Sequence, residues 1–86
     1  MKELERILKS VANRRRLAIL QFLKRNKEAS VGDIAAAIKL SFRSTSRHLA
    51  ILSSADILEK EQRSIAVYYS LTDKKNSTLD HIISVL

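Results

Sequence analysis

The sequence predicts a mostly α-helical domain with one small β-hairpin, and three observations lead to this fold class. Four successive segments space their apolar residues as helices do, one later segment is rich in β-branched and aromatic residues, and the last segment returns to the helical spacing. The chain has 86 residues, no proline and one glycine. We therefore expect a single compact domain over residues 1–86, without a long linker.

Two amphipathic helices are expected in the N-terminal part. In the first, over residues 1–11, apolar residues recur at i, i+3, i+4 and i+7 and so form one stripe. These residues are Leu4, Ile7, Leu8 and Val11. The second helix is predicted to begin after Asn13, a good N-cap residue, and to end around residues 24–26. Its apolar residues are Leu17, Leu20, Phe22 and Leu23.

A third and a fourth helix follow, each preceded by a serine that can cap it. Ser30 with Asp33 three residues later resembles a capping box, and Ser41 can cap a helix that reaches about Ala55. At about 100° per residue, the fourth helix has a core face and a polar, basic face. The core face carries Thr45, Leu49 and Leu52, and the other face carries Arg43, Ser46, Arg47, Ala50 and Ser54.

The pattern then changes to a hairpin over residues 58–71, with a turn expected near Arg63 and Ser64. A final helix over residues 75–86 repeats the i, i+3, i+4, i+7 spacing of the first. With a short connection between the third and fourth helices, the order of elements is that of a winged helix-turn-helix domain.

Charge and composition narrow the function classes. Sixteen Lys and Arg against nine Asp and Glu give a net charge of +7, which favours a polyanionic partner. Nucleic acid is favoured over a membrane surface because the apolar residues are spread over several short elements that need one another for burial. The absence of cysteine excludes disulfides and thiol chemistry, and no signal peptide or membrane span is evident, so we expect a soluble cytoplasmic protein.

Several segments resemble the ArsR/SmtB family of winged-helix repressors, over about residues 8–72. Residues 12–20 look like the entry to the family's second helix, and residues 30–35 look like its third helix. The segment from Leu40 to Leu52 is close to the family's recognition helix, and residues 67–71 match its second wing strand, VYYxL. Asp56 stands where the family usually has glycine, in a left-handed conformation that aspartate tolerates better than most residues.

The resemblance implies a sequence-specific regulator of transcription, a repressor in the family's manner, that binds double-stranded DNA at a palindromic operator. Short hydroxyl side chains and arginines can read base edges in the major groove. The base-reading candidates are Arg43, Ser44, Ser46 and Arg47. The alternative is a polar helix face that is merely solvated. Phe42, at the start of this helix, has two interpretations: contact with a thymine methyl group or packing on the third helix.

Contacts to the DNA backbone are expected at helix N-termini and at the wing. Three arginines begin the second helix, where the macrodipole disfavours cations, so a phosphate there would explain them. The alternative is a solvated basic turn with one arginine tied to a carboxylate. Arg63 joins the set by the family's geometry. The DNA-backbone candidates are Arg14, Arg15, Arg16, Ser41 and Arg63.

In the family the two terminal helices form a two-fold interface, so the resemblance implies a homodimer held by residues 1–11 and 75–86. The expected contact residues are Leu4, Ile7, Leu8, Leu79, Ile82, Ile83 and Leu86. The alternative is that both helices only cover the monomer's own core. Relatives sense metals through cysteines or Asp and His pairs, but Asp80 and His81 point about 100° apart, so we expect no metal and no cofactor.

No catalytic constellation stands out, and we expect no enzyme activity. Two other binding functions stay open at this point, because function does not follow from fold. One is a protein-interaction module, and the other is nonspecific nucleic-acid or RNA binding through the same basic face.

Overall fold

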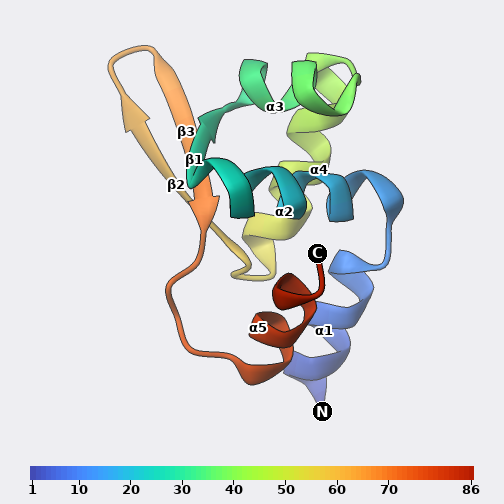
Figure 1. Ribbon diagram of the computed structural model, residues 1–86. Coiled ribbons are helices and arrows are strands. Elements are labelled where there is room, and N and C mark those ends of the chain that lie inside the picture. Colours follow the sequence, from blue (N-terminus) through green and yellow to red (C-terminus); the bar gives the residue numbers. More distant parts are fainter.

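In a computed structural model, which describes all residues 1–86, the chain forms five helices and a three-stranded sheet (Figure 1). The predicted fold class and the predicted order of elements are confirmed, with one short strand added. The elements are α1 (Lys2–Val11), α2 (Arg14–Asn26), β1 (Glu28–Ser30), α3 (Val31–Ile38), α4 (Phe42–Ser54), β2 (Leu58–Arg63), β3 (Ala66–Leu71) and α5 (Ser77–Ser84).

Side-chain caps fix where four of the helices begin. The Asn13 side chain accepts hydrogen bonds from the amides of the first turn of α2. Ser30 caps α3 and Ser41 caps α4 in the same way, so the three predicted caps are confirmed. Asn76 accepts from the Leu79 amide at 2.9 Å and starts α5 at Ser77, two residues later than predicted.

The sheet is antiparallel throughout, in the order β1-β3-β2. Arg63 faces Ala66 across the hairpin, so its turn consists of Ser64 and Ile65, one residue beyond the predicted position. Ser64 takes a positive φ of 58° there. The hairpin of β2 and β3 with this turn is called the wing below.

The core lies where α2, α3, α4 and the base of the sheet meet. Ile19 and Leu20 of α2 and Leu49 and Leu52 of α4 have no exposed surface, and Thr45 of α4 lies beside them, also fully buried. Burial of a large aliphatic side chain contributes about 1.5–3 kcal/mol, so this row fixes the rotation of α4 about its axis. The predicted core face of the helix is thereby confirmed.

The terminal helices lie together at the end of the molecule opposite to α3 and the tip of the wing (Figure 1). Asn76 at the start of α5 donates to Glu3 of α1 at 3.1 Å. The other end of α5 is tied to α2, where Gln21 donates to the Leu86 carbonyl at 3.0 Å and Lys24 to the Ser84 carbonyl at 3.3 Å. None of the helices combines the length and apolar character that a bilayer crossing requires.

Four residues take a positive φ, and none of them is a glycine. They are Lys27, Lys39, Asp56 and Ser64. Asp56 has a φ of 60° immediately after α4, which confirms the left-handed conformation expected there. Such a conformation costs an L-residue roughly 1 kcal/mol or more relative to glycine. The backbone of these turns is therefore strained.

Candidate nucleic-acid interface

The outward face of α4 presents two arginines one helical turn apart. The buried residues Thr45 and Leu49 orient the helix so that Arg43 and Arg47 are exposed. Neither guanidinium forms an ion pair with a carboxylate of the chain. Both cations are therefore available to an external anion or acceptor.

The hydroxyl and apolar groups beside these arginines are accessible to different degrees. Ser44 and Ser46, the other predicted base-reading residues, are half-buried. Ser41 is exposed, but its hydroxyl already accepts a hydrogen bond from the Ser44 amide at 3.1 Å. Phe42 is 63% exposed, so most of its surface is free.

Lys39 is a cation at this surface that the sequence reasoning did not single out. It ends α3 in a left-handed conformation and is exposed in the connection that leads to α4. Its position between the two helices of the helix-turn-helix was readable from the sequence. A single lysine in a turn, however, carries no pattern that separates it from an ordinary solvated residue.

The three arginines of α2 separate into different roles. Arg14 is exposed and forms no ion pair. Arg15 is exposed but donates to the Ile38 carbonyl at the end of α3, at 2.8 Å. Of the three, Arg16 is the most engaged within the chain. Its side chain is half-buried and donates to the Ser10 carbonyl, and it also contacts His48, so it serves the fold.

His48 connects α4 to α2. Its Nδ1 lies 3.2 Å from Arg16 Nη1, and because a guanidinium can only donate, Nδ1 accepts and the ring proton is on Nε2. Burial lowers the pKa of His48, and the charges of Arg16 and Arg15 lower it further. The neutral imidazole is thus the form that fits this contact.

Arg63, which was predicted to contact DNA from the wing, is also engaged within the chain. Its guanidinium donates to both carboxylate oxygens of Glu28 and to Glu61, and it lies 4.8 Å from the centre of the Tyr68 ring. Hydrogen bonding to Arg63 lowers the pKa of Glu28, and the same contacts raise the pKa of Arg63. The sequence could not show this, because Glu28 comes from β1, 35 residues away along the chain.

The predicted dimer residues fall into two groups. Ile7 and Leu79 are 4% and 3% exposed, so they are buried within the monomer and offer little surface to a partner. Leu4 and Leu8 of α1 are 37% and 47% exposed. The remaining residues pack partly on the core and are half-buried: Ile82, Ile83 and Leu86.

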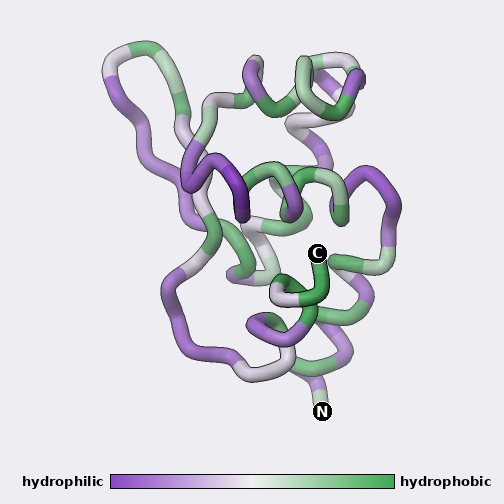
Figure 2. Tube along the Cα trace, in the orientation of Figure 1, coloured by the Kyte–Doolittle hydropathy of each residue, from purple (hydrophilic) through white to green (hydrophobic).

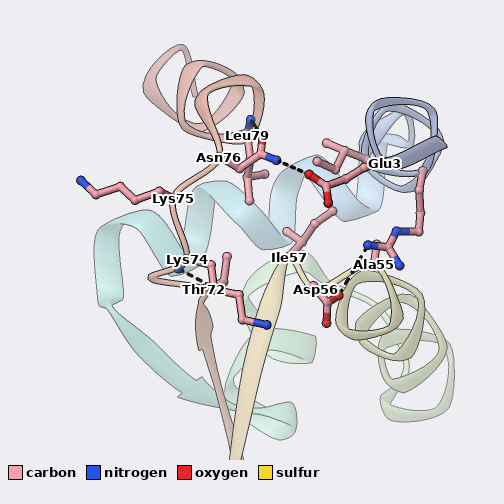
Figure 3. Close-up of a pocket in the computed structure, with 11 residues that line it drawn as sticks. Glu3, Ala55, Asp56, Ile57, Thr72, Lys74, Lys75, Asn76 and Leu79 are labelled. Carbon is pink, nitrogen blue, oxygen red and sulfur yellow. Dashed lines mark hydrogen bonds and ion pairs between the residues drawn. The ribbon is translucent and has the colours of Figure 1, made fainter. Parts of the chain in front are cut away.

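A pocket of about 170 Å³ opens between α1, the end of α4 and the segment before α5 (Figure 3). Its polar groups largely satisfy one another: Asn76 donates to Glu3, and Arg6 lies 3.5 Å from Asp56. Lys75 points away from the pocket. No group of three or more His, Asp or Glu side chains is arranged to hold a metal ion.

Comparison with known proteins finds a family profile for a helix-turn-helix domain that matches residues 11–61. The transcriptional activator HlyU of Vibrio cholerae is 38% identical over 66 residues, which cover 77% of this chain and 60% of that protein. The match thus spans less than two thirds of the relative.

Solved structures agree over nearly the whole chain. Reduced HlyU from Vibrio cholerae is 30% identical with a TM-score of 0.85, covering 99% of this chain and 85% of that one. A homodimeric winged helix-turn-helix DNA-binding domain from Mycobacterium bovis, described as a possible ArsR-family regulator, is 26% identical with a TM-score of 0.84 and covers 98% and 74%. The transcriptional repressor PagR of Bacillus anthracis is 26% identical with a TM-score of 0.82 and covers 98% and 92%.

Proposed function

We propose that this chain, which belongs to the ArsR/SmtB-type family of winged helix-turn-helix regulators, binds double-stranded DNA sequence-specifically as a homodimer and so regulates transcription. The observation that supports this most directly is the outward face of α4, where Arg43 and Arg47 are exposed and unpaired above a buried core row. Because the relatives include one named an activator and one named a repressor, the proposal concerns DNA binding and regulation of either sign.

Base reading is assigned to α4. An α-helix fits the major groove, where an arginine can donate two hydrogen bonds to O6 and N7 of guanine. Arg43 and Arg47 are placed for this contact, with Ser44 and Ser46 as shorter hydroxyl partners beside them. Such an arginine discriminates its base pair by about 1–3 kcal/mol.

Backbone contacts are assigned to exposed cations around α4. Arg14 at the start of α2 and Lys39 in the connection before α4 form no ion pair, and Arg15 next to Arg14 is exposed. Ser41 at the N-terminus of α4 is a further candidate, because amides at a helix start favour a phosphate. Phosphate contacts add affinity without sequence preference and make binding dependent on salt.

Dimerisation is assigned to the terminal helices. Leu4 and Leu8 leave apolar surface at the end of the molecule away from the wing tip. The half-buried residues of α5 lie at the same end, where α5 is hydrogen-bonded to α1 (Figure 1). A two-fold dimer would present two recognition helices about 34 Å apart, which matches half-sites one helical turn apart.

The test compares Arg47→Ala with Lys75→Ala, which removes the same charge from a side chain that points into solvent at the opposite end. Fluorescence anisotropy on a duplex selected by the native chain and on a random duplex is the measurement. We expect Arg47→Ala to lose about 1–3 kcal/mol on the selected duplex and much less on the random one. Equal losses on both duplexes, or the same loss in Lys75→Ala, would contradict base reading.

A further inference from the structure

We propose that the pocket between α1, the end of α4 and the segment before α5 binds a small zwitterion, namely an α-amino acid with a short aliphatic side chain (Figure 3). This inference concerns a second binding site and does not depend on the proposed function. Three features of the pocket carry it: its apolar lining, its charged groups of both signs, and its position on α1.

The first feature is an apolar lining of limited size. The pocket reaches the core of the molecule, where Ile7, Ile57 and Leu79 line it. Its volume is about 170 Å³. A cavity of about 150 Å³ in another protein holds one benzene molecule, so this pocket has room for a ligand of about that size. A short aliphatic side chain fits both the volume and the lining.

The second feature is a set of charged groups whose contacts with one another are weak. Arg6 reaches Asp56 through one contact of 3.5 Å, and 48% and 60% of these two side chains are exposed. An exposed pair of this kind adds little stability, so a ligand can replace it. Glu3 accepts one hydrogen bond from Asn76, although a carboxylate offers about four acceptor positions. The segment before α5 is hydrophilic (Figure 2), and its Lys74 lines the pocket without forming an ion pair.

These charges favour a zwitterion over a ligand with a single charge. Because Lys75 points away, two cations and two carboxylates remain at the pocket, and a ligand of one sign would meet repulsion as well as attraction (Figure 3). A ligand carboxylate can instead bind Arg6 and Lys74. A ligand ammonium group can bind Glu3 and Asp56. Asp56 keeps its carboxylate here although its φ of 60° is a conformation that glycine adopts without steric cost.

The third feature is that the pocket stays accessible in the proposed dimer. Successive residues of a helix differ by about 100°, so Arg6 and Leu8 point about 160° apart around α1. The surface assigned to the dimer, Leu4 and Leu8, therefore lies on a different side of α1 from Arg6. Asp56, on another wall, lies close to the end of α4, so a bound ligand would contact both a terminal helix and the residues that follow α4.

The test is isothermal titration calorimetry of the native chain with L-alanine, L-valine and L-leucine. Isobutyrate and isobutylamine are the matched controls, since they are valine without its amino group and without its carboxylate. We expect saturable binding of at least one of the amino acids. Both control compounds should bind at least about tenfold more weakly than L-valine, because each leaves one pair of charged groups without a partner.

A pair of variants locates the binding site. Arg6→Gln should bind the amino acid at least about tenfold more weakly, because the charge-assisted contact to the ligand carboxylate is lost. Lys2→Gln removes a cation from the same helix outside the pocket and should bind as the native chain does. Equal thermal melting of the native chain and Arg6→Gln without ligand checks that the fold is unchanged.

Three results would overturn the proposal. They are no binding of any of the three amino acids, binding of isobutyrate or isobutylamine as tight as that of L-valine, and equal binding by the native chain and Arg6→Gln. The comparison of compounds uses the native chain alone, so it decides the proposal even if Arg6→Gln is less stable. None of these results bears on the proposed function, which is tested on DNA without added amino acid.

Discussion

At the scale of single residues, the exposed arginines of α4 depend on what lies buried beneath them. Thr45 is fully buried, and its hydroxyl has no hydrogen-bond partner. An unpaired buried hydroxyl costs about 1–3 kcal/mol. The residue that helps to orient Arg43 and Arg47 is therefore itself a source of instability.

We predict that Thr45→Val raises the free energy of unfolding by about 1 kcal/mol, because it keeps the side-chain shape and removes the unpaired hydroxyl. Urea denaturation followed by circular dichroism measures this. Thr45→Ser is the control, since it keeps the hydroxyl and loses a methyl group, and it should lower the stability. A stabilising Thr45→Ser would contradict the explanation.

His48 makes stability depend on pH. Its folded pKa lies below the ordinary value of 6.5, so the unfolded chain binds the proton more readily. The stability due to the neutral ring is therefore fully present above pH 6.5, falls as the pH drops through that value, and levels off below the folded pKa. The His48→Asn side chain can still accept a hydrogen bond from Arg16 but does not titrate. We therefore predict that this part of the pH dependence of stability is lost in denaturation curves recorded between pH 8 and pH 5. An unchanged profile would show that another group titrates in this range.

Phe42 offers a prediction about specificity. Because 63% of the residue is exposed at the start of α4, it is placed to contact a thymine methyl group in the major groove. Replacing thymine by deoxyuridine in the selected site should weaken the native chain, whereas Phe42→Ala should bind both duplexes equally. Similar sensitivity of the two proteins to deoxyuridine would rule out this contact.

At the scale of elements, the helix-turn-helix contains a strained connection. Lys39 ends α3 with φ 56° and ψ 51°, a conformation that glycine adopts without steric cost. We predict that Lys39→Gly raises the free energy of unfolding by about 0.5–1 kcal/mol while it weakens DNA binding by removing a phosphate contact. Lys24→Gly, within the last turn of α2, is the control and should destabilise the fold. A loss of stability in Lys39→Gly would contradict the assignment of strain.

The elements also show what a sequence alone can predict here. Helix periodicity and the serine and asparagine caps predicted α1 to α4 closely, because each signal is local. The strand β1 was missed because three residues are too short to show alternation, and its pairing partner, β3, is far along the chain. The contacts that Arg16 and Arg63 make within the chain were not predicted for the same reason, since their partners His48 and Glu28 are brought to them only by the tertiary fold.

At the scale of the whole molecule, the chain is polarised. The wing tip and the start of α4 project at one end, and the terminal helices lie at the other (Figure 1). The sequence predicted the helices and the hairpin found at the two ends. It could not show which apolar residues of the terminal helices are buried in the core of the monomer. Ile7 and Leu79 fill the monomer core, so Leu4 and Leu8 provide the apolar surface on α1 that we assign to the dimer.

We predict that Leu8→Glu converts a dimer into a folded monomer and weakens operator binding, because a half-exposed leucine is replaced by a charge that a partner would have to desolvate. Sedimentation velocity at micromolar concentration measures the oligomeric state. Ala37→Glu, on the exposed side of α3, is the control for added charge and should stay dimeric. A native chain that sediments as a monomer would exclude the assigned interface.

The most direct test of the central claim is selection of bound sequences from a pool of random duplexes with the native chain and with the double variant Arg43→Ala, Arg47→Ala. If the outward face of α4 reads DNA, the native chain will enrich an inverted repeat with half-sites about one helical turn apart, and the double variant will lose that enrichment. Failure of the native chain to enrich any sequence, or the same enriched repeat in both proteins, would contradict it.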